Sequence, residues 1–91
     1  MRAFVLTVSG RVQGVGFRAC VKRIADSLAI TGEVLNLADG RVRIVAVAEE
    51  MILEKFISML YGCPRAIVRD VRAETVESDP YSDFQVRRGL F

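Results

Sequence analysis

The residues with the clearest potential for chemistry stand in one stretch, from Ser9 to Arg18, which reads SGRVQGVGFR. It contains Gly10, Gly14 and Gly16 and ends in an arginine. Glycine lets a ligand approach the backbone closely, and the first turn of a helix offers unpaired N–H groups and a partial positive charge. If a helix begins here, the stretch can bind a phosphate or a carboxylate, and the arginine can hold two oxygens of that anion.

The glycine spacing does not match the familiar nucleotide-binding patterns. It is G-x-x-x-G-x-G rather than G-x-G-x-x-G, and no G-K-[ST] follows it. The stretch on its own is therefore open to two interpretations, an anion-binding turn or a purely structural turn between two elements.

Length, charge and composition limit the possible functions. The chain has 91 residues, a net charge of +2 and no histidine. This length favours one small domain over residues 1–91, and the small charge excess argues against a nucleic-acid partner. A histidine general base and histidine metal ligands are excluded. The sequence has no apolar run of membrane-spanning length and no signal-peptide pattern, so we expect a cytoplasmic protein without a membrane partner.

Only two cysteines are present, Cys20 and Cys63. Two cysteines do not make the disulfide framework of a small secreted domain. We therefore expect both to be reduced, buried thiols in a cytoplasmic protein.

The hydrophobic pattern predicts elements on both sides of the glycine stretch. Apolar residues alternate over 2–9, which is typical of a half-buried strand, and their period becomes helical from Phe17 to about Leu28. Asp39-Gly40 is a strong hairpin signal between strands at 33–37 and 41–48. A second helix is expected from about 50 until Gly62 and Pro64 end it, followed by strands at 66–77 and 84–87.

This order predicts an α+β fold. We expect a ferredoxin-like two-layer sandwich, βαββαβ with a short extra C-terminal strand, in which two helices cover one face of an antiparallel sheet. The alternative is another α+β sandwich. In the ferredoxin-like arrangement the first two strands run in the same direction, so Asn36, at the end of the second, comes to the same edge as the glycine stretch and Arg18.

Two motifs in these regions resemble those of one family. Residues 10–18, GRVQGVGFR, are similar to the G-R-V-Q-G-V-x-[FY]-R motif of the acylphosphatases, and residues 32–42, GEVLNLADGRV, are similar to their G-[WYF]-V-x-N-x-x-[DE]-G-x-V motif. The spacing between the motifs also matches, and the resemblance covers nearly the whole chain. It implies a small stand-alone enzyme that hydrolyses acyl phosphates to a carboxylate and inorganic phosphate.

The resemblance also implies roles for particular residues. Arg18 would bind the phosphate and Asn36 would hold the attacking water, so these two are the predicted catalytic residues. The phosphate cradle would be formed by backbone amides of Gln13, Gly14, Val15, Gly16, Phe17 and Arg18. No metal and no organic cofactor are implied. The partners would be the acyl phosphate and inorganic phosphate, with no nucleic acid, and we expect a monomer.

Phosphoryl transfer requires mainly positioning and charge neutralisation, which amides and a guanidinium supply. A carboxylate is a good leaving group and needs no strong acid to protonate it, which is consistent with a chain that has no histidine. No titratable side chain is obviously placed as the base, and we expect a phosphate oxygen of the substrate to take the proton.

Some positions depart from the family pattern or leave other interpretations open. Glu33 replaces the usual aromatic residue, and by strand alternation we expect it to change the packing of one sheet face rather than catalysis. Arg87 and Arg88 are expected to be a solvated tail. A non-enzymatic anion-binding module remains an alternative, as in the related domain of a larger hydrogenase-maturation carbamoyltransferase. An RNA-binding domain of the same fold is disfavoured, because the strand at 41–45 carries no aromatic residue.

Overall fold

The computed structural model of the protein describes residues 1–88. Its elements follow the predicted order: β1 (Arg2–Arg11), α1 (Phe17–Ser27), β2 (Thr31–Asn36), β3 (Val42–Ala48), α2 (Glu50–Leu60), β4 (Ile67–Val76) and β5 (Phe84–Val86). Within the described part of the chain, neither helix is long and apolar enough to cross a membrane.

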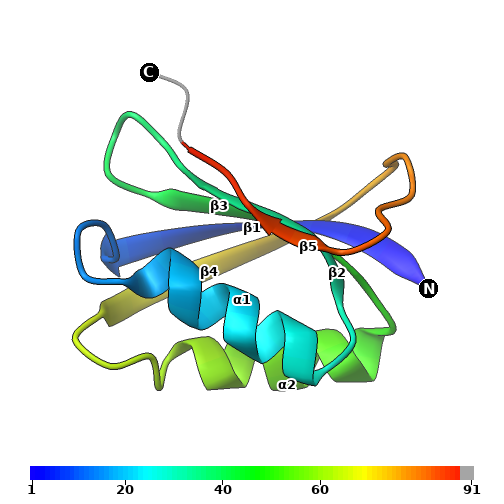
Figure 1. Cartoon of the computed structure of the whole chain (residues 1–91), viewed down its shortest axis with the longest axis horizontal. Coiled ribbons are helices and arrows are strands. Elements are labelled where there is room, and N and C mark those ends of the chain that lie inside the picture. Colours follow the sequence, from blue (N-terminus) through cyan, green and yellow to red (C-terminus); the bar gives the residue numbers. More distant parts are fainter. Residues whose placement is uncertain (89–91) are drawn as a thin grey trace.

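The five strands form one sheet in the order β4-β1-β3-β2-β5, and both helices lie on the same face of it (Figure 1). Three of the four strand pairs are antiparallel, as predicted. The fourth differs, because β5 pairs with β2 in parallel. The sheet is therefore mixed rather than purely antiparallel, and the short extra strand extends the β2 edge of a ferredoxin-like sandwich.

The core lies between the sheet and the two helices. It is built from the residues that alternate along each strand, such as Phe4, Leu6 and Val8 of β1, whose side chains are all buried. From the helix side, α1 contributes Phe17 and Val21 to the same hydrophobic cluster. Because successive strand residues point to opposite faces, the other residues of β1 lie on the open face of the sheet.

The prediction of two reduced thiols is wrong. Cys20 of α1 and Cys63, which follows α2, form a disulfide, with their Cα atoms 6.0 Å apart. Both are buried, as expected. The pairing arises because the two helices pack on the same face of the sheet, which brings together residues 43 positions apart in the sequence. Helix periodicity shows that each cysteine is buried but not that they face each other.

The topology brings two distant connections to one end of the molecule. Both β1 and β2 pair antiparallel with β3, so they run in the same direction. The glycine stretch after β1 and the β2–β3 hairpin consequently lie at the same end, on the left in Figure 1. Asn36, the last residue of β2, is thereby placed near the start of α1, as the sequence predicts.

Candidate active site

The loop between β1 and α1 has the backbone conformation of an anion-binding turn. Gly14 has φ 73° and Gly16 has φ 75°, both in the left-handed region that favours glycine. Gly16 is the N-cap of α1, and within residues 1–88 no side chain caps this helix N-terminus. The leading N–H groups of α1 are thus available to an anion, next to the positive end of the helix dipole.

A cavity of about 470 Å³ opens beside this loop. It is lined by Val12, Gly14, Gly16, Phe17, Arg18, Ala19, Asn36, Val86, Arg87 and Arg88. The structure therefore brings together the two residues predicted to be catalytic, Arg18 from α1 and Asn36 from β2. Of the predicted cradle, Gln13 and Val15 are not among the lining residues.

Arg18 is half-buried and is held by the end of β5. Its Nη1 donates a hydrogen bond to the carbonyl oxygen of Arg87 at 2.7 Å. A guanidinium carries five N–H donors in a planar fork, so this contact fixes the group while leaving other donors for a ligand. The prediction of a solvated tail does not hold for Arg87, whose backbone and side chain both make contacts.

Asn36 offers an unused acceptor toward the helix side of the sheet. It lies on the same strand face as Val34, whose side chain is fully buried in the core. The Oδ1 atom of Asn36 is buried and has no hydrogen-bond partner among residues 1–88. A buried acceptor without a donor is costly, so this atom is suited to accept a hydrogen bond from a small molecule in the cavity.

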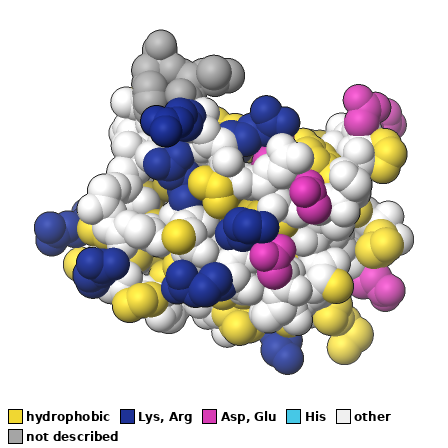
Figure 2. Space-filling view, viewed as in Figure 1, with side chains coloured by type: hydrophobic (Ala, Val, Ile, Leu, Met, Phe, Trp, Pro, Cys, Tyr) yellow, Lys and Arg dark blue, Asp and Glu magenta, His cyan; other side chains and the backbone are white. Residues whose placement is uncertain are grey.

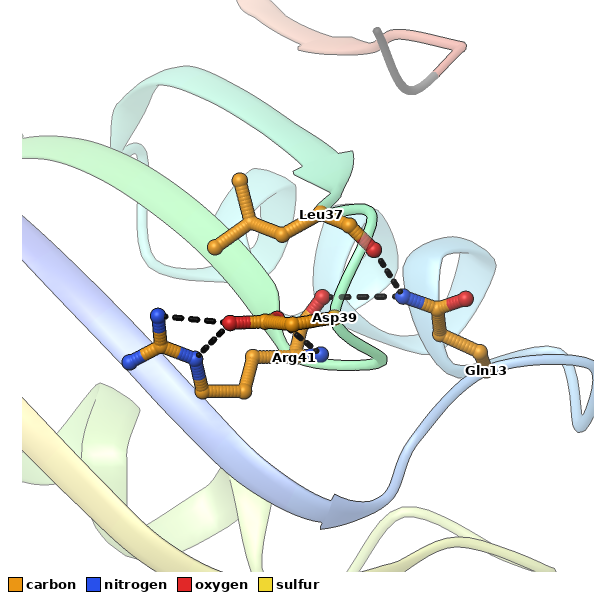
Figure 3. Close-up of polar contacts among 4 residues, drawn as sticks. All are labelled: Gln13, Leu37, Asp39 and Arg41. Carbon is orange, nitrogen blue, oxygen red and sulfur yellow. Dashed lines mark hydrogen bonds and ion pairs between the residues drawn. The ribbon is translucent and has the colours of Figure 1, made fainter. Parts of the chain in front are cut away.

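The side chain of Gln13 links the glycine loop to the β2–β3 hairpin (Figure 3). Its Nε2 donates to the carbonyl oxygens of Leu37, at 2.8 Å, and Arg41, at 2.9 Å. The resemblance to the family motif implies only a backbone role for this residue. Because Leu37 follows Asn36 directly, these bonds fix the loop relative to the strand end that carries Asn36. A glutamine before a glycine turn gives no local signal of such a long-range contact.

The hairpin itself is stabilised by its own side chains. The backbone N–H of Arg41 donates to Asp39 Oδ1 at 3.0 Å, and the Arg41 guanidinium contacts Asp39 Oδ2 at 2.7 Å (Figure 3). The first of these bonds holds the pKa of the Asp39 carboxyl below its ordinary value. These contacts stabilise the hairpin, whose Leu37 and Arg41 carbonyl oxygens accept the bonds from Gln13 and which directly follows Asn36.

The surroundings of the cavity are positively charged. Of the residues that the structure describes, Arg18, Arg87 and Arg88 line the cavity and no acidic residue does, although the guanidinium of Arg87 is paired with Glu33. Lys and Arg side chains gather on the half of this face that holds the loop and the start of α1, whereas acidic side chains lie mostly toward the other half (Figure 2). Such a field attracts anions. Between residues 1 and 88, no group of three or more Cys, Asp or Glu could hold a metal ion.

The fold is that of a small α+β domain with a cavity at the start of its first helix. The family model for acylphosphatase matches residues 4–86. An acylphosphatase from Archaeoglobus fulgidus is 49% identical over 87 residues, which are 94% of this chain and 98% of that protein. The structure of an acylphosphatase from Coxiella burnetii is 40% identical with a TM-score of 0.87, and the match covers 94% of this chain and 92% of the other.

The same domain also occurs within larger proteins. The HypF structure from T. kodakarensis is 32% identical with a TM-score of 0.86, and the match covers 99% of this chain but 12% of that one. The chain belongs to the acylphosphatase family. This confirms the family and the ferredoxin-like fold predicted from the sequence, and it favours a hydrolase over the non-enzymatic module.

Proposed function

We propose that the cavity beside the glycine loop hydrolyses acyl phosphates to a carboxylate and inorganic phosphate. The observation that carries this proposal is the meeting of three groups in one cavity: the uncapped N-terminus of α1, the Arg18 side chain and the Asn36 side chain. Each group alone is common in proteins. Together they supply an anion cradle, a fixed cation and a neutral polar group beside them.

In this proposal the phosphoryl group lies at the start of α1. Backbone amides between Gln13 and Arg18 and the free N–H groups of the Arg18 guanidinium bind its oxygens. The positive φ values of Gly14 and Gly16 and the bond from Arg18 to Arg87 support this role, because they restrict the positions of these donors. They neutralise the negative charge on the transferring oxygens without reorganising during the reaction.

Asn36 orients the attacking water in the same proposal. Its buried Oδ1 accepts a hydrogen bond from the water, which restricts the direction of attack on phosphorus. A bond forms between the water oxygen and phosphorus, and the bond between phosphorus and the acyl oxygen breaks. The carboxylate leaves with the electron pair of that bond, and a phosphate oxygen of the substrate takes the proton from the water.

We further propose that the domain over residues 1–91 acts as a monomer, in the cytoplasm, with no metal or organic cofactor and no nucleic-acid or membrane partner. The Cys20–Cys63 disulfide is compatible with this location where the cytoplasm permits such bonds, as in hyperthermophilic archaea and bacteria. Trapping of free thiols in intact cells tests the location. Two alkylated cysteines support a reducing cytoplasm, and two protected ones contradict it.

The activity is tested with benzoyl phosphate in buffer that contains EDTA. The proposal predicts release of inorganic phosphate well above the spontaneous rate. Saturable binding of inorganic phosphate without turnover would instead support a non-enzymatic anion-binding domain.

A further inference from the structure

The edge strand β5 is bonded at both of its ends to α1, the helix that carries Arg18. At its start, Lys22 Nζ donates to the carbonyl oxygen of Phe84 at 2.9 Å. At its end, Arg18 Nη1 donates to the carbonyl oxygen of Arg87 at 2.7 Å. Lys22 and Arg18 are four residues apart, so both project from one side of α1. The position of the Arg18 guanidinium therefore depends on where the end of β5 is held.

The end of β5 is held against β2 by its backbone and by one side chain. The N–H of Arg87 donates to the carbonyl oxygen of Val34 at 2.8 Å. The Nε of Arg87 lies 2.7 Å from Glu33 Oε1, and the Glu33 side chain is only 13% exposed. This contact uses the residue that departs from the aromatic position of the family motif.

Strand alternation places this ion pair on the opposite side of the sheet from the cavity. Val34 and Val86 are register partners in the parallel pair, and Val86 lines the cavity. Glu33 and Arg87 each neighbour one of these residues, so their side chains lie on the open face. Arg87 thus presents its carbonyl oxygen to Arg18, while its guanidinium is directed away to Glu33.

We infer that Glu33 is a positioning residue for phosphate binding, acting through Arg87 on the guanidinium of Arg18. The inference rests on the proposed role of Arg18 as a phosphate ligand. Glu33 fixes the Arg87 backbone and keeps the Arg87 guanidinium out of the cavity. The carbonyl of Arg87 then holds Arg18 in the orientation that phosphate requires. This gives the departure from the family motif a function beyond sheet packing.

The test measures the affinity of the folded protein for inorganic phosphate by calorimetry, with Glu33→Gln as the main variant. The matched control is Glu54→Gln, which makes the same charge change on an exposed position of α2. We expect Glu33→Gln to weaken phosphate binding about three- to fivefold, the size of effect that a partly exposed ion pair can have. Glu54→Gln should leave the affinity unchanged.

A double-variant cycle separates positioning from a general structural effect. In an Arg18→Ala background, Glu33→Gln should have no further effect, because its influence passes through Arg18. An equal loss in both backgrounds would overturn the inference, and so would unchanged or tighter binding in Glu33→Gln alone. Arg87→Gln should give the same loss as Glu33→Gln, and a much larger loss would show that Arg87 itself binds phosphate.

The Arg18→Ala variant distinguishes a failure of the proposed role of Glu33 from a failure of the proposed function. Unchanged phosphate affinity in Arg18→Ala would contradict the proposed role of Arg18. A loss in Arg18→Ala together with normal affinity in Glu33→Gln would overturn only the role of Glu33. Thermal unfolding of each variant checks that it is folded, and Glu33→Asp serves as a second variant that retains the charge and should bind more tightly than Glu33→Gln.

Discussion

The Nε2 atom of Gln13 donates a hydrogen bond to the carbonyl oxygen of Leu37, 24 residues away in the sequence, at 2.8 Å. The same nitrogen reaches the carbonyl oxygen of Arg41. These two bonds connect the loop before α1 to the hairpin that follows Asn36. One side chain thus links the proposed cradle to the hairpin after Asn36, in addition to the pairing of β1 and β2 with β3 in the sheet.

Gln13→Ala removes both bonds. We expect the free energy of unfolding to fall by about 1 kcal/mol and the affinity for inorganic phosphate to fall with it. Urea denaturation and calorimetry measure the two quantities. The control is Gln85→Ala, because among residues 1–88 the Gln85 amide bonds only to the exposed carboxylate of Asp83. Equal phosphate affinity in the two variants would show that the Gln13 contact does not shape the cradle.

Asn36→Ala removes the proposed water-positioning group. We expect kcat for benzoyl phosphate to fall about 100-fold, a typical effect of lost orientation, while the affinity for phosphate changes little. Stability should not fall, because Asn36 Oδ1 is a buried acceptor without a partner among the described residues. Steady-state kinetics and phosphate titration give both quantities. A collapse of phosphate affinity would instead assign Asn36 to phosphate binding.

The disulfide should contribute substantially to stability. Closing a loop between residues 43 apart constrains the unfolded chain, and we expect reduction to lower the free energy of unfolding by roughly 2–4 kcal/mol. Denaturation with and without dithiothreitol measures this difference. The Cys20→Ala, Cys63→Ala double variant should be insensitive to dithiothreitol. Two titratable thiols in the protein purified under oxidising conditions would contradict the disulfide.

Gly14 and Gly40 form a matched pair for testing the loop conformation. Both have positive φ, and at both an added Cβ would meet no atom within 4 Å. Alanine at either position should therefore cost about 1–2 kcal/mol of stability through backbone strain alone. Gly14 lines the cavity and Gly40 does not, so only Gly14→Ala should also weaken phosphate binding. Equal phosphate affinity in both would show that the Gly14 conformation is not needed for binding.

The sequence predicts those site features that depend on local pattern and on topology. Arg18 and Asn36 lie at the start of a helix and the end of a strand whose periods are visible, and the order of elements brings those ends together. The contact between Arg18 and Arg87 depends on the parallel pairing of β2 with β5. A strand of three residues does not encode its neighbour, because either edge of the sheet could accept it.

The sequence does not reveal the pairing of Cys20 with Cys63 for a related reason. Helical periodicity identifies the buried side of each element, but not how two helices lie beside each other on a sheet. The ion pair between Glu33 and Arg87 likewise joins two open-face positions that are 54 residues apart in the sequence. Sequence alternation correctly predicts the face of Glu33 and says nothing about its partner.

The most direct test of the central claim is the release of inorganic phosphate from benzoyl phosphate by the natural protein and by Arg18→Ala, both in EDTA. We predict rapid hydrolysis by the natural protein and a loss of about 100-fold or more in kcat/KM for the variant, as when a fixed group that stabilises transition-state charge is removed. Equal hydrolysis by the two proteins would contradict the account.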